Sequence, residues 1–310
     1  MPAVSIDNLR QLLPTQDIVR YDNSSQTIIL RDGRQLAVWL FRQQTSARTC
    51  VAALDRLNGD SAVPALWGAD VAGHLCGTSF VVADAPRGQL LAHVDALLSH
   101  DQRYAIGQQI GHIVARWHTH AMAGFGALYD ATQSLITIRD QRVSQAISAL
   151  VDAQLAPAVA LHALIPTINA LYHIPSTNAV LVCGDIDPET VWIARQGARW
   201  QVTSITSWSS AHAGLASAEH VRLHHHFDGE QWFALRVGYG EAYDEQTPNP
   251  GMQVREHALH GERVLYTLQL AAAAARRGDR NRAHPLLTLV QRWCAAFSPE
   301  ATFSTTEENA

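Results

Sequence analysis

The chain changes its hydrophobic pattern once, near Pro86, and that change limits the folds it can adopt. Before it, the apolar runs Thr27–Leu30, Gln35–Phe41 and Ser79–Ala83 have the alternation and flanking turn residues of β-strands. After it, apolar residues in Asp101–His120 recur at three- and four-residue intervals, the spacing of a buried helix face. A strand-rich start followed by a helical remainder predicts an α+β protein with two lobes.

The first lobe is expected to end where Pro86 and Gly88 interrupt the strand pattern. We predict a first lobe of antiparallel strands with one helix at Ser46–Leu57, spanning residues 1–85, a helical second lobe spanning residues 86–297, and a polar tail at residues 298–310. Further helices are expected at Gln141–Leu155, at Pro157–His173 with a kink or break at Pro166, at Gln231–Tyr243, at Arg255–Arg277 and near Pro285–Phe297.

Composition excludes several kinds of function. All 23 basic residues are arginine, so no mechanism that depends on a lysine side chain is possible. The formal charge of −5 and the scattered arginines give no footprint for nucleic acid. The start of the chain has no signal pattern, and no apolar run is long enough to span a membrane. The four cysteines are far apart, which favours a reduced, cytoplasmic protein.

The segment between residues 179 and 208 is the best candidate for chemistry. Short strands are expected at Ala179–Cys183, Val191–Ala194 and Trp200–Ile205, with a turn at Gln196-Gly197. The first strand runs into Gly184-Asp185 and a tight turn at Asp187-Pro188. A fixed carboxylate at a strand end can act as a general base toward a hydroxyl, so Asp185 is the candidate base. The alternative, which we favour, is that Asp185 braces the loop by accepting backbone N–H bonds.

The order of these motifs resembles the aminoglycoside phosphotransferase and choline/fructosamine kinase family. Cys-Gly-Asp-x-Asp-Pro-x-Thr followed by Ile-Thr-Ser-Trp is similar to its His-Gly-Asp-x-x-x-x-Asn and Ile-Asp-Trp segments. Three flanking segments match in the same order, namely Phe80–Gly88 as the hinge between the lobes, Ile110–Leu128 as a helix and turn, and Phe233–Tyr243 as a late helix. The resemblance covers residues 27 to 295 and implies a two-lobed protein-kinase-like fold.

The departures from the family pattern fall on its functional positions. Asp185 matches the catalytic base, but Thr190 replaces the metal-binding Asn and Ser207 replaces the main metal-binding Asp. The resemblance places Trp39, Ala83 and Ala85 at the nucleotide cleft, and the phosphate-binding lysine falls near Trp39. The glutamate partner of that lysine would fall near Arg48 or Thr49, the motif histidine has become Cys183, and Asp17–Ser25 has no glycine-rich loop.

These losses imply a pseudokinase that binds a small ligand or a protein partner and needs no cofactor. The alternative is a divergent, active small-molecule kinase that uses ATP and Mg²⁺, with Asp185 as base and metal held by Asp187 or Glu189. Sequence-adjacent acids in a turn are more often solvated, so Asp187 is a weak metal candidate.

Two further features have ordinary and functional interpretations. Trp192, Trp200 and Trp208 are expected to face the cleft, either to bind a planar ligand or to fill vacated space. His224-His225-His226 and His118-x-His120 suggest a metal site, but consecutive helical residues point apart, so an exposed helix end or a pH-sensitive patch is favoured for residues 224–226. Cys183 is expected to be a buried, inert thiol.

Overall fold

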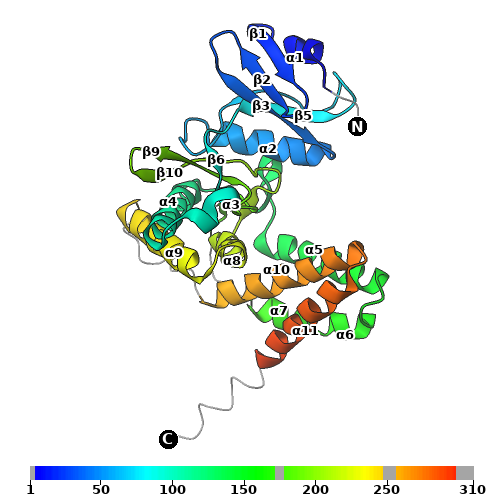
Figure 1. Ribbon diagram of the computed structural model, residues 1–310. Helices are drawn as coiled ribbons and strands as arrows, with labels where there is room; N and C mark the ends of the chain where they lie inside the picture. Colours follow the sequence, from blue (N-terminus) through cyan, green and yellow to red (C-terminus); the bar gives the residue numbers. More distant parts are fainter. Residues whose placement is uncertain (1–3, 172–177, 247–255, 298–310) are drawn as a thin grey trace, which may run out of the picture.

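Residues 4–171, 178–246 and 256–297 are described by a computed structural model of the chain, without the side chains of residues 243–246 and 256–258. The chain forms a β-rich N-terminal lobe and a larger, mainly helical C-terminal lobe (Figure 1), so the predicted two-lobed α+β fold is confirmed. Within these residues no helix combines the length and the hydropathy needed to cross a bilayer.

The N-terminal lobe is a five-stranded antiparallel sheet in the order β1-β2-β3-β5-β4. Its elements are α1 (Ile6–Leu12), β1 (Ile18–Asp22), β2 (Thr27–Leu30), β3 (Gln35–Phe41), α2 (Gln44–Arg56), β4 (Leu66–Asp70) and β5 (Ser79–Asp84). β2, β3, α2 and β5 confirm the predicted elements, whereas α1, β1 and β4 were not predicted. α1 begins with a capping box in which Ser5 and Asn8 satisfy each other's backbone N–H groups.

The two faces of this sheet pack in different cores. Leu36 and Val38 of β3 are buried with α1 in a small core confined to the N-terminal lobe. The alternate residues Trp39 and Phe41 lie on the other face, partly buried against the large core that also contains α2. That core continues into the C-terminal lobe, so the lobes share one apolar interior.

The C-terminal lobe begins with a short strand and a long helix. Its first part consists of β6 (Gln89–Leu90), α3 (Leu91–Val94), a 3₁₀ turn (Asp95–Leu97), α4 (His100–His118), β7 (Gly126–Ala127) and a second 3₁₀ turn (Leu128–Asp130). The predicted apolar stripe of α4 is confirmed, because Ile106, Ile110, Ile113 and Trp117 are all buried. α4 begins at a capping box formed by Ser99 and Gln102.

Helices and two small sheets complete the lobe. They are α5 (Leu135–Asp152), α6 (Ala158–His162), α7 (Ile165–Leu171), β8 (Val180–Val182), β9 (Val191–Gln196), β10 (Arg199–Ile205), β11 (His212–Gly214), α8 (Ala216–His226), α9 (Gly229–Gln246), α10 (Glu256–Arg276) and α11 (Arg280–Ala296). The small sheets have the orders β10-β9-β6 and β7-β11-β8.

Most predicted helices of this lobe are confirmed, with three differences in their bounds. The helix expected over Gln141–Leu155 begins earlier, at Leu135, as α5. The helix expected over Pro157–His173 is divided into α6 and α7, as Pro166 suggested, although the break precedes that proline. α11 begins at Arg280, before Pro285, because Pro285 lies in its first turns and Asp279 caps its N-terminus. α8 and β11 were not predicted, and the predicted tail at residues 298–310 lies outside the described residues.

Candidate functional site

The loop between β8 and β9 carries Asp185 at the end of a buried strand. Gly184 precedes it with φ +87°, a conformation that favours glycine. A Cβ atom at Gly184 would lie 2.6 Å from the carbonyl oxygen of Ser210, so the site also excludes a side chain by contact. The carboxylate of Asp185 is therefore presented from a tightly constrained backbone.

Two side chains of α8 hold the peptide groups just before Asp185. The Glu219 carboxylate accepts hydrogen bonds from the backbone N–H of Cys183 (2.5 Å) and of Gly184 (3.2 and 3.3 Å). The Arg222 guanidinium donates a hydrogen bond to the Gly184 carbonyl oxygen and lies over the ring of Tyr266, 5.6 Å from its centroid. α8 thus fixes both the N–H and the C=O of Gly184.

Glu219 is fully buried, and burial raises its pKa to about 7. The Arg222 charge and the backbone N–H groups of Gly184 and Cys183 oppose this shift because they favour the ionised carboxylate. A pKa raised in the folded chain means that proton uptake by Glu219 favours the closed loop, so the hold on the loop is sensitive to pH near neutrality.

Asp185 itself is partly exposed and lies beside the predicted metal position Ser207. The Ser207 hydroxyl donates to Oδ2 of Asp185 at 3.4 Å. The Thr190 hydroxyl contacts the carbonyl oxygens of Asp185 (3.3 Å) and Asp187 (3.0 Å). The structure therefore brings Asp185, Thr190 and Ser207 together, and the two hydroxyls interact with the loop itself.

Asp187 and Glu189 close the turn that follows. Oδ1 of Asp187 accepts a hydrogen bond from the Glu189 N–H at 2.8 Å, and the Asp187 N–H donates to the Thr190 hydroxyl at 3.0 Å. Such bonds are typical of an Asx turn, in which a short acid braces the backbone. The bracing role that we favoured for Asp185 is therefore filled by Asp187, whereas the Asp185 carboxylate accepts its hydrogen bond from the Ser207 hydroxyl.

The loop is a poor fit for a magnesium ion. Mg²⁺ requires hard oxygen ligands in near-octahedral geometry, usually with one or two carboxylates. Here the Ser207 hydroxyl donates to the Asp185 carboxylate, and the Thr190 hydroxyl is engaged by the backbone carbonyl of Asp185. Within the described residues no group of three His, Cys, Asp or Glu side chains is placed to hold a metal ion. We therefore derive no step through a metal.

Trp39 lies on β3, at the position where the resemblance predicts the phosphate-binding lysine. It pairs with Val81 of β5 and packs against the core shared by the lobes. In α2, Arg48 places its guanidinium 4.6 Å from the ring centroid of Tyr129, and Thr49 is buried. An indole and an exposed cation–π pair thus stand where the resemblance predicts a lysine–glutamate ion pair.

The hinge segment uses its own backbone donors internally. Ala83 is fully buried and pairs with both β3 and β4. The Asp84 N–H donates to the Ala65 carbonyl at 2.9 Å, the Ala85 N–H donates to the Gln35 carbonyl at 3.0 Å, and Pro86 has no N–H. A purine needs a backbone donor for its ring nitrogen, so the three consecutive residues 84–86 offer it none.

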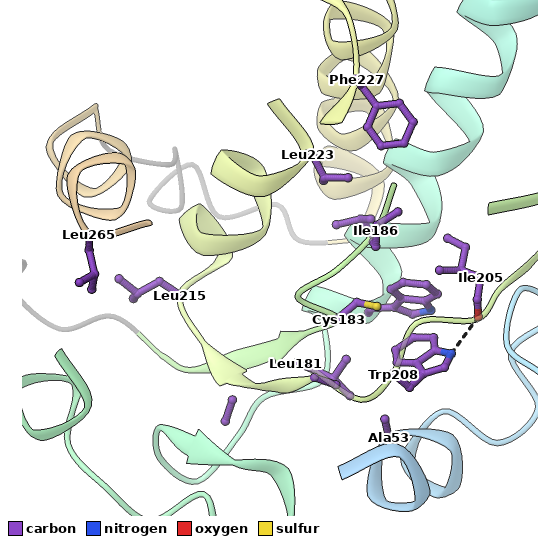
Figure 2. Packing of buried hydrophobic residues seen from close by; sticks show 14 of the residues in the cluster. Ala53, Leu181, Cys183, Ile186, Ile205, Trp208, Leu215, Leu223, Phe227 and Leu265 are labelled. Carbon is purple, nitrogen blue, oxygen red and sulfur yellow. Dashed lines mark hydrogen bonds between the residues drawn. The ribbon is translucent and has the colours of Figure 1, made fainter. Parts of the chain in front are cut away.

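The three tryptophans of this region differ in exposure. Trp192 and Trp200 are partly buried, but Trp208 is only 1% exposed. Trp208 stacks edge-on against Trp117 at 4.8 Å and donates its indole N–H to the Ile205 carbonyl at 2.8 Å; Figure 2 shows Ala53 of α2 beside it. The expectation that Trp208 faces a cleft is wrong, because its ring fills the shared core. Cys183, in the same cluster, donates its thiol to the Ser207 carbonyl at 3.1 Å, and burial raises its pKa, as expected of an inert thiol.

The histidines of interest lie in two different settings. His224–His226 form the last turn of α8, as the helix-end interpretation predicted. His225 contacts the rings of His226 and Tyr266 at 5.1 and 5.7 Å, whereas His224 faces Trp232 at 5.2 Å. His118 is buried at the end of α4, far in sequence from its aromatic neighbours.

Sequence reasoning missed Glu219 and Arg222, the two residues that hold the loop. The only sequence signal for this pair is its spacing of three residues, which places both side chains on one face of a helix. The segment that contains them, Ala216–His226, was not recognised as a helix. A buried glutamate and a partly buried arginine on the helix face toward a glycine loop become meaningful only when β8 and α8 are known to be neighbours.

The comparisons with known proteins agree with this geometry. No protein-family model and no curated protein matches the sequence. An aminoglycoside phosphotransferase crystallised with GDP and kanamycin is similar in structure, with a TM-score of 0.63, 13% identity, and coverage of 94% of this chain and 98% of that chain. A ternary complex of another such enzyme with streptomycin and ATP gives 0.61, 12%, 94% and 97% for the same quantities.

A Thermobifida fusca protein assigned as a fructosamine-3-kinase is also similar, with a TM-score of 0.59, 17% identity, and coverage of 91% and 98% of the two chains. The chain therefore has the fold of aminoglycoside phosphotransferases and fructosamine kinases. The resemblance recognised in the sequence is confirmed at the level of the fold.

Proposed function

We propose that this chain is a pseudokinase, a protein with the aminoglycoside phosphotransferase fold that does not transfer phosphoryl groups and acts by binding a small ligand or a protein partner. The observation that carries the proposal is Trp39, whose indole packs on the shared core at the position of the phosphate-binding lysine. Phosphoryl transfer depends on neutralising phosphate charge, and an indole supplies none.

The metal positions support the same conclusion. Ser207 and Thr190 direct their hydroxyls to Asp185 and to loop carbonyls. Removing one preorganised electrostatic contributor costs about 3–4 kcal/mol of transition-state stabilisation, and here the lysine and two metal ligands are replaced together. Such effects do not add, but the loss of all three is incompatible with ordinary kinase rates.

The hinge supports it independently. The N–H groups of Asp84 and Ala85 are satisfied by Ala65 and Gln35, so adenine recognition would require two backbone bonds to break. Breaking a buried backbone bond without replacement costs about 1–3 kcal/mol. A nucleotide would therefore find no preformed phosphate contact at Trp39 and no preformed base contact at residues 84–86.

The second candidate function is an active small-molecule kinase with Asp185 as general base. The observation that favours it is the rigid presentation of a partly exposed Asp185 carboxylate by Glu219 and Arg222. If Asp185 were merely structural, there would be no need to hold both the N–H and the C=O of the preceding residue, Gly184.

A thermal-shift titration separates the two functions. The full chain is titrated with ATP, with Mg²⁺, and with both, and GDP with Mg²⁺ is added because similar structures contain that nucleotide. We expect no shift in any arm. A stabilisation that requires nucleotide and Mg²⁺ together, which at 100 times Kd amounts to about 2.7 kcal/mol, would contradict the pseudokinase proposal.

Asp185→Asn gives the second arm, with Asp55→Asn, at an exposed position of α2, as its control. If the chain is an enzyme, Asp185→Asn abolishes nucleotide consumption and Asp55→Asn retains it. If the chain is a binding protein, neither variant consumes nucleotide. Neither substitution then alters ligand or partner binding by removing a catalytic step.

A further inference from the structure

A cluster of imidazole and aromatic rings, buried at His118, His220 and Tyr239 and exposed at His224, lies where α4, α8 and α9 meet. We call it the histidine cluster, and it consists of His118 (α4), His220 and His224 (α8), and Trp232 and Tyr239 (α9). His118 is 2% exposed and His220 is 5% exposed. The cluster is remote in sequence from the loop that carries Asp185, and nothing in the proposed function uses it.

The rings of the cluster are in direct contact. His118 Nδ1 and the Tyr239 hydroxyl share a hydrogen bond of 3.0 Å. The His220 ring stands edge-on to Tyr239 at 4.4 Å, and the His118 and His220 centroids are 6.1 Å apart. His220 donates its Nδ1–H to the Ala216 carbonyl, whereas Nε2 of His118 is buried without a hydrogen-bond partner among the described residues.

This arrangement is built for neutral rings. Burial lowers the pKa of His220 to about 4, and burial together with the neighbouring His220 lowers the pKa of His118 well below its ordinary value. The titratable and charged groups around the two rings come from three helices: His118 from α4, Tyr239 and Arg236 from α9, and His224 from α8. The pKa of His224 is itself lowered by burial and by the charges of Arg263 on α10 and of Arg236. A proton on either ring would meet a second imidazole or an arginine at close range.

Two walls of the cluster are in close backbone contact with each other. α4 and α9 touch through glycines, because a Cβ atom on Gly111 would lie 2.1 Å from the Leu235 carbonyl oxygen and one on Gly238 would lie 2.2 Å from that of Gln108. These two helices therefore have no room to approach each other further. α8, an 11-residue helix that carries His220, is the third wall.

α8 also holds the loop before Asp185. Glu219 is adjacent to His220 in sequence, and Arg222 lies two residues beyond it. Glu219 accepts the N–H groups of Cys183 and Gly184, and Arg222 donates to the Gly184 carbonyl. A displacement of α8 therefore breaks the bonds that constrain the loop.

We propose that His118 and His220 form an acid-sensitive latch on α8, so that protonation of either ring releases the Gly184 peptide from Glu219 and Arg222 and loosens the loop that carries Asp185. The inference is independent of whether that loop performs chemistry, because it concerns only the coupling between the histidine cluster and the loop backbone.

Glu219 titrates in the opposite sense and sets the design of the test. Its raised pKa means that proton uptake favours the closed loop as pH falls through about 7. The contribution of the histidines is therefore measured as a difference between proteins that share Glu219. For one ring whose pKa is 6.5 in the released state and about 4 in the latched state, lowering the pH from about 7.5 to about 5.5 raises the opening equilibrium about tenfold.

The experiment is hydrogen–deuterium exchange on the full chain at these two pH values, read as protection factors for peptides covering residues 180–190. Wild type is compared with the double variant His118→Gln and His220→Gln, whose amides fill similar space without titrating. The matched control is His284→Gln, an exposed histidine of α11. When the pH is lowered, the protection factors of wild type and of the control should shift toward opening relative to those of the double variant. We expect this relative shift to be about tenfold or more.

Equal pH-dependent changes, within about twofold, in wild type and the double variant would overturn the proposal, since one ring alone predicts about tenfold. The proposal would also be overturned if Glu219→Gln alone removed the pH-dependent change in protection seen in wild type, because Glu219 would then be the sensor. If the double variant fails to fold, an NMR titration of the wild-type imidazole resonances decides the question. His118 and His220 must then titrate together with the Gly184 amide and below the ordinary histidine range, and titration near the ordinary pKa overturns the latch.

Discussion

The carboxylate of Glu219 and the backbone N–H of Gly184 are joined across 35 residues of sequence by hydrogen bonds of 3.2 and 3.3 Å. The same carboxylate accepts the N–H of Cys183, and its side chain is fully buried. One acid on α8 therefore provides the acceptors for two consecutive buried amides at the start of the candidate loop.

Replacing Glu219 with Ala should destabilise the protein strongly. Both amides would be left buried without an acceptor, at about 1–3 kcal/mol each, so the free energy of unfolding should fall by about 2–5 kcal/mol. Glu219→Gln should lose less than half of that amount, because its amide oxygen can still accept. Glu189→Ala, at an exposed acid of the same loop, is the control and should change stability by less than about 0.5 kcal/mol. Urea denaturation measures all three, and equal losses for Ala and Gln would contradict the acceptor role.

The titration of Glu219 should make stability fall as pH rises through neutrality. Its pKa is about 7 in the folded chain, whereas the ordinary value for a glutamate side chain is 4.5. A raised folded-state pKa gives a contribution that is complete below about pH 4.5 and is lost as pH rises through about 7. The contribution of this single group is about 3 kcal/mol between those limits. Comparing wild type with Glu219→Gln from about pH 5 to about pH 8 isolates it, and parallel pH profiles would show that Glu219 does not titrate in this range.

The contact between α4 and α9 predicts opposite effects for two glycine substitutions. Gly111→Ala would place a methyl group 2.1 Å from the Leu235 carbonyl oxygen, so the helices must separate, and we expect a loss of about 3 kcal/mol or more. Gly240→Ala, on α9, meets nothing within 4 Å and should stabilise the helix by about 0.5–1 kcal/mol. Thermal unfolding of the two variants gives the comparison, and a neutral Gly111→Ala would mean that the helices are not in backbone contact.

Asp60, between α2 and β4, should be important for joining the lobes. It accepts hydrogen bonds from the Arg116 guanidinium (3.2 and 3.3 Å) and from the indole N–H of the buried Trp117 (3.2 Å). Asp60→Ala leaves that N–H unsatisfied and should cost about 1–3 kcal/mol. Asp55→Ala, at an exposed position of α2, is the control and should be nearly neutral. Urea denaturation followed by tryptophan fluorescence would contradict the role of Asp60 if the two variants were equally stable.

The substitution Ser207→Asp should make the stability of the protein depend on Mg²⁺. The new carboxylate would lie beside Asp185, since the present hydroxyl is 3.4 Å from Oδ2 of that residue. Like charges at this distance repel, so the variant should be destabilised without metal, and Mg²⁺ at millimolar concentration should restore stability. Ser210→Asp, at an exposed position, is the control and should not respond to Mg²⁺. A thermal shift of the control as large as that of the variant would contradict a site at Asp185.

The elements with strong patterns were predictable from the sequence. β2, β3 and β5 are short apolar runs bounded by turn residues, and α4 has an unbroken apolar stripe, so their bounds were close to those observed. α8 was missed because its buried face carries Glu219, His220 and Ser217, which are polar residues that a hydrophobic pattern does not detect. Their burial is made possible by partners from β8, α4 and α9, and sequence spacing cannot identify such partners.

The candidate site was predicted in composition but not in geometry. Asp185, Thr190 and Ser207 do lie together, because the strands on either side of the loop fix their order. The burial of Trp208 was not predictable, since a tryptophan at a strand end has the same local sequence whether it faces solvent or Trp117. Its environment is decided by packing between elements that are distant along the chain.

The attachment of the hinge determines how the lobes can move. Ala85 is bonded to β3 through Gln35, whereas the Arg87 carbonyl accepts a hydrogen bond from Thr203 at 2.7 Å and Gly88 lies against the Ile193 carbonyl. The first attachment belongs to the N-terminal lobe and the other two to the C-terminal lobe. The torsions available for relative rotation are thus confined to the backbone around Pro86, whose ring fixes φ. Relative rotation of the two lobes therefore has few backbone torsions available at this crossing.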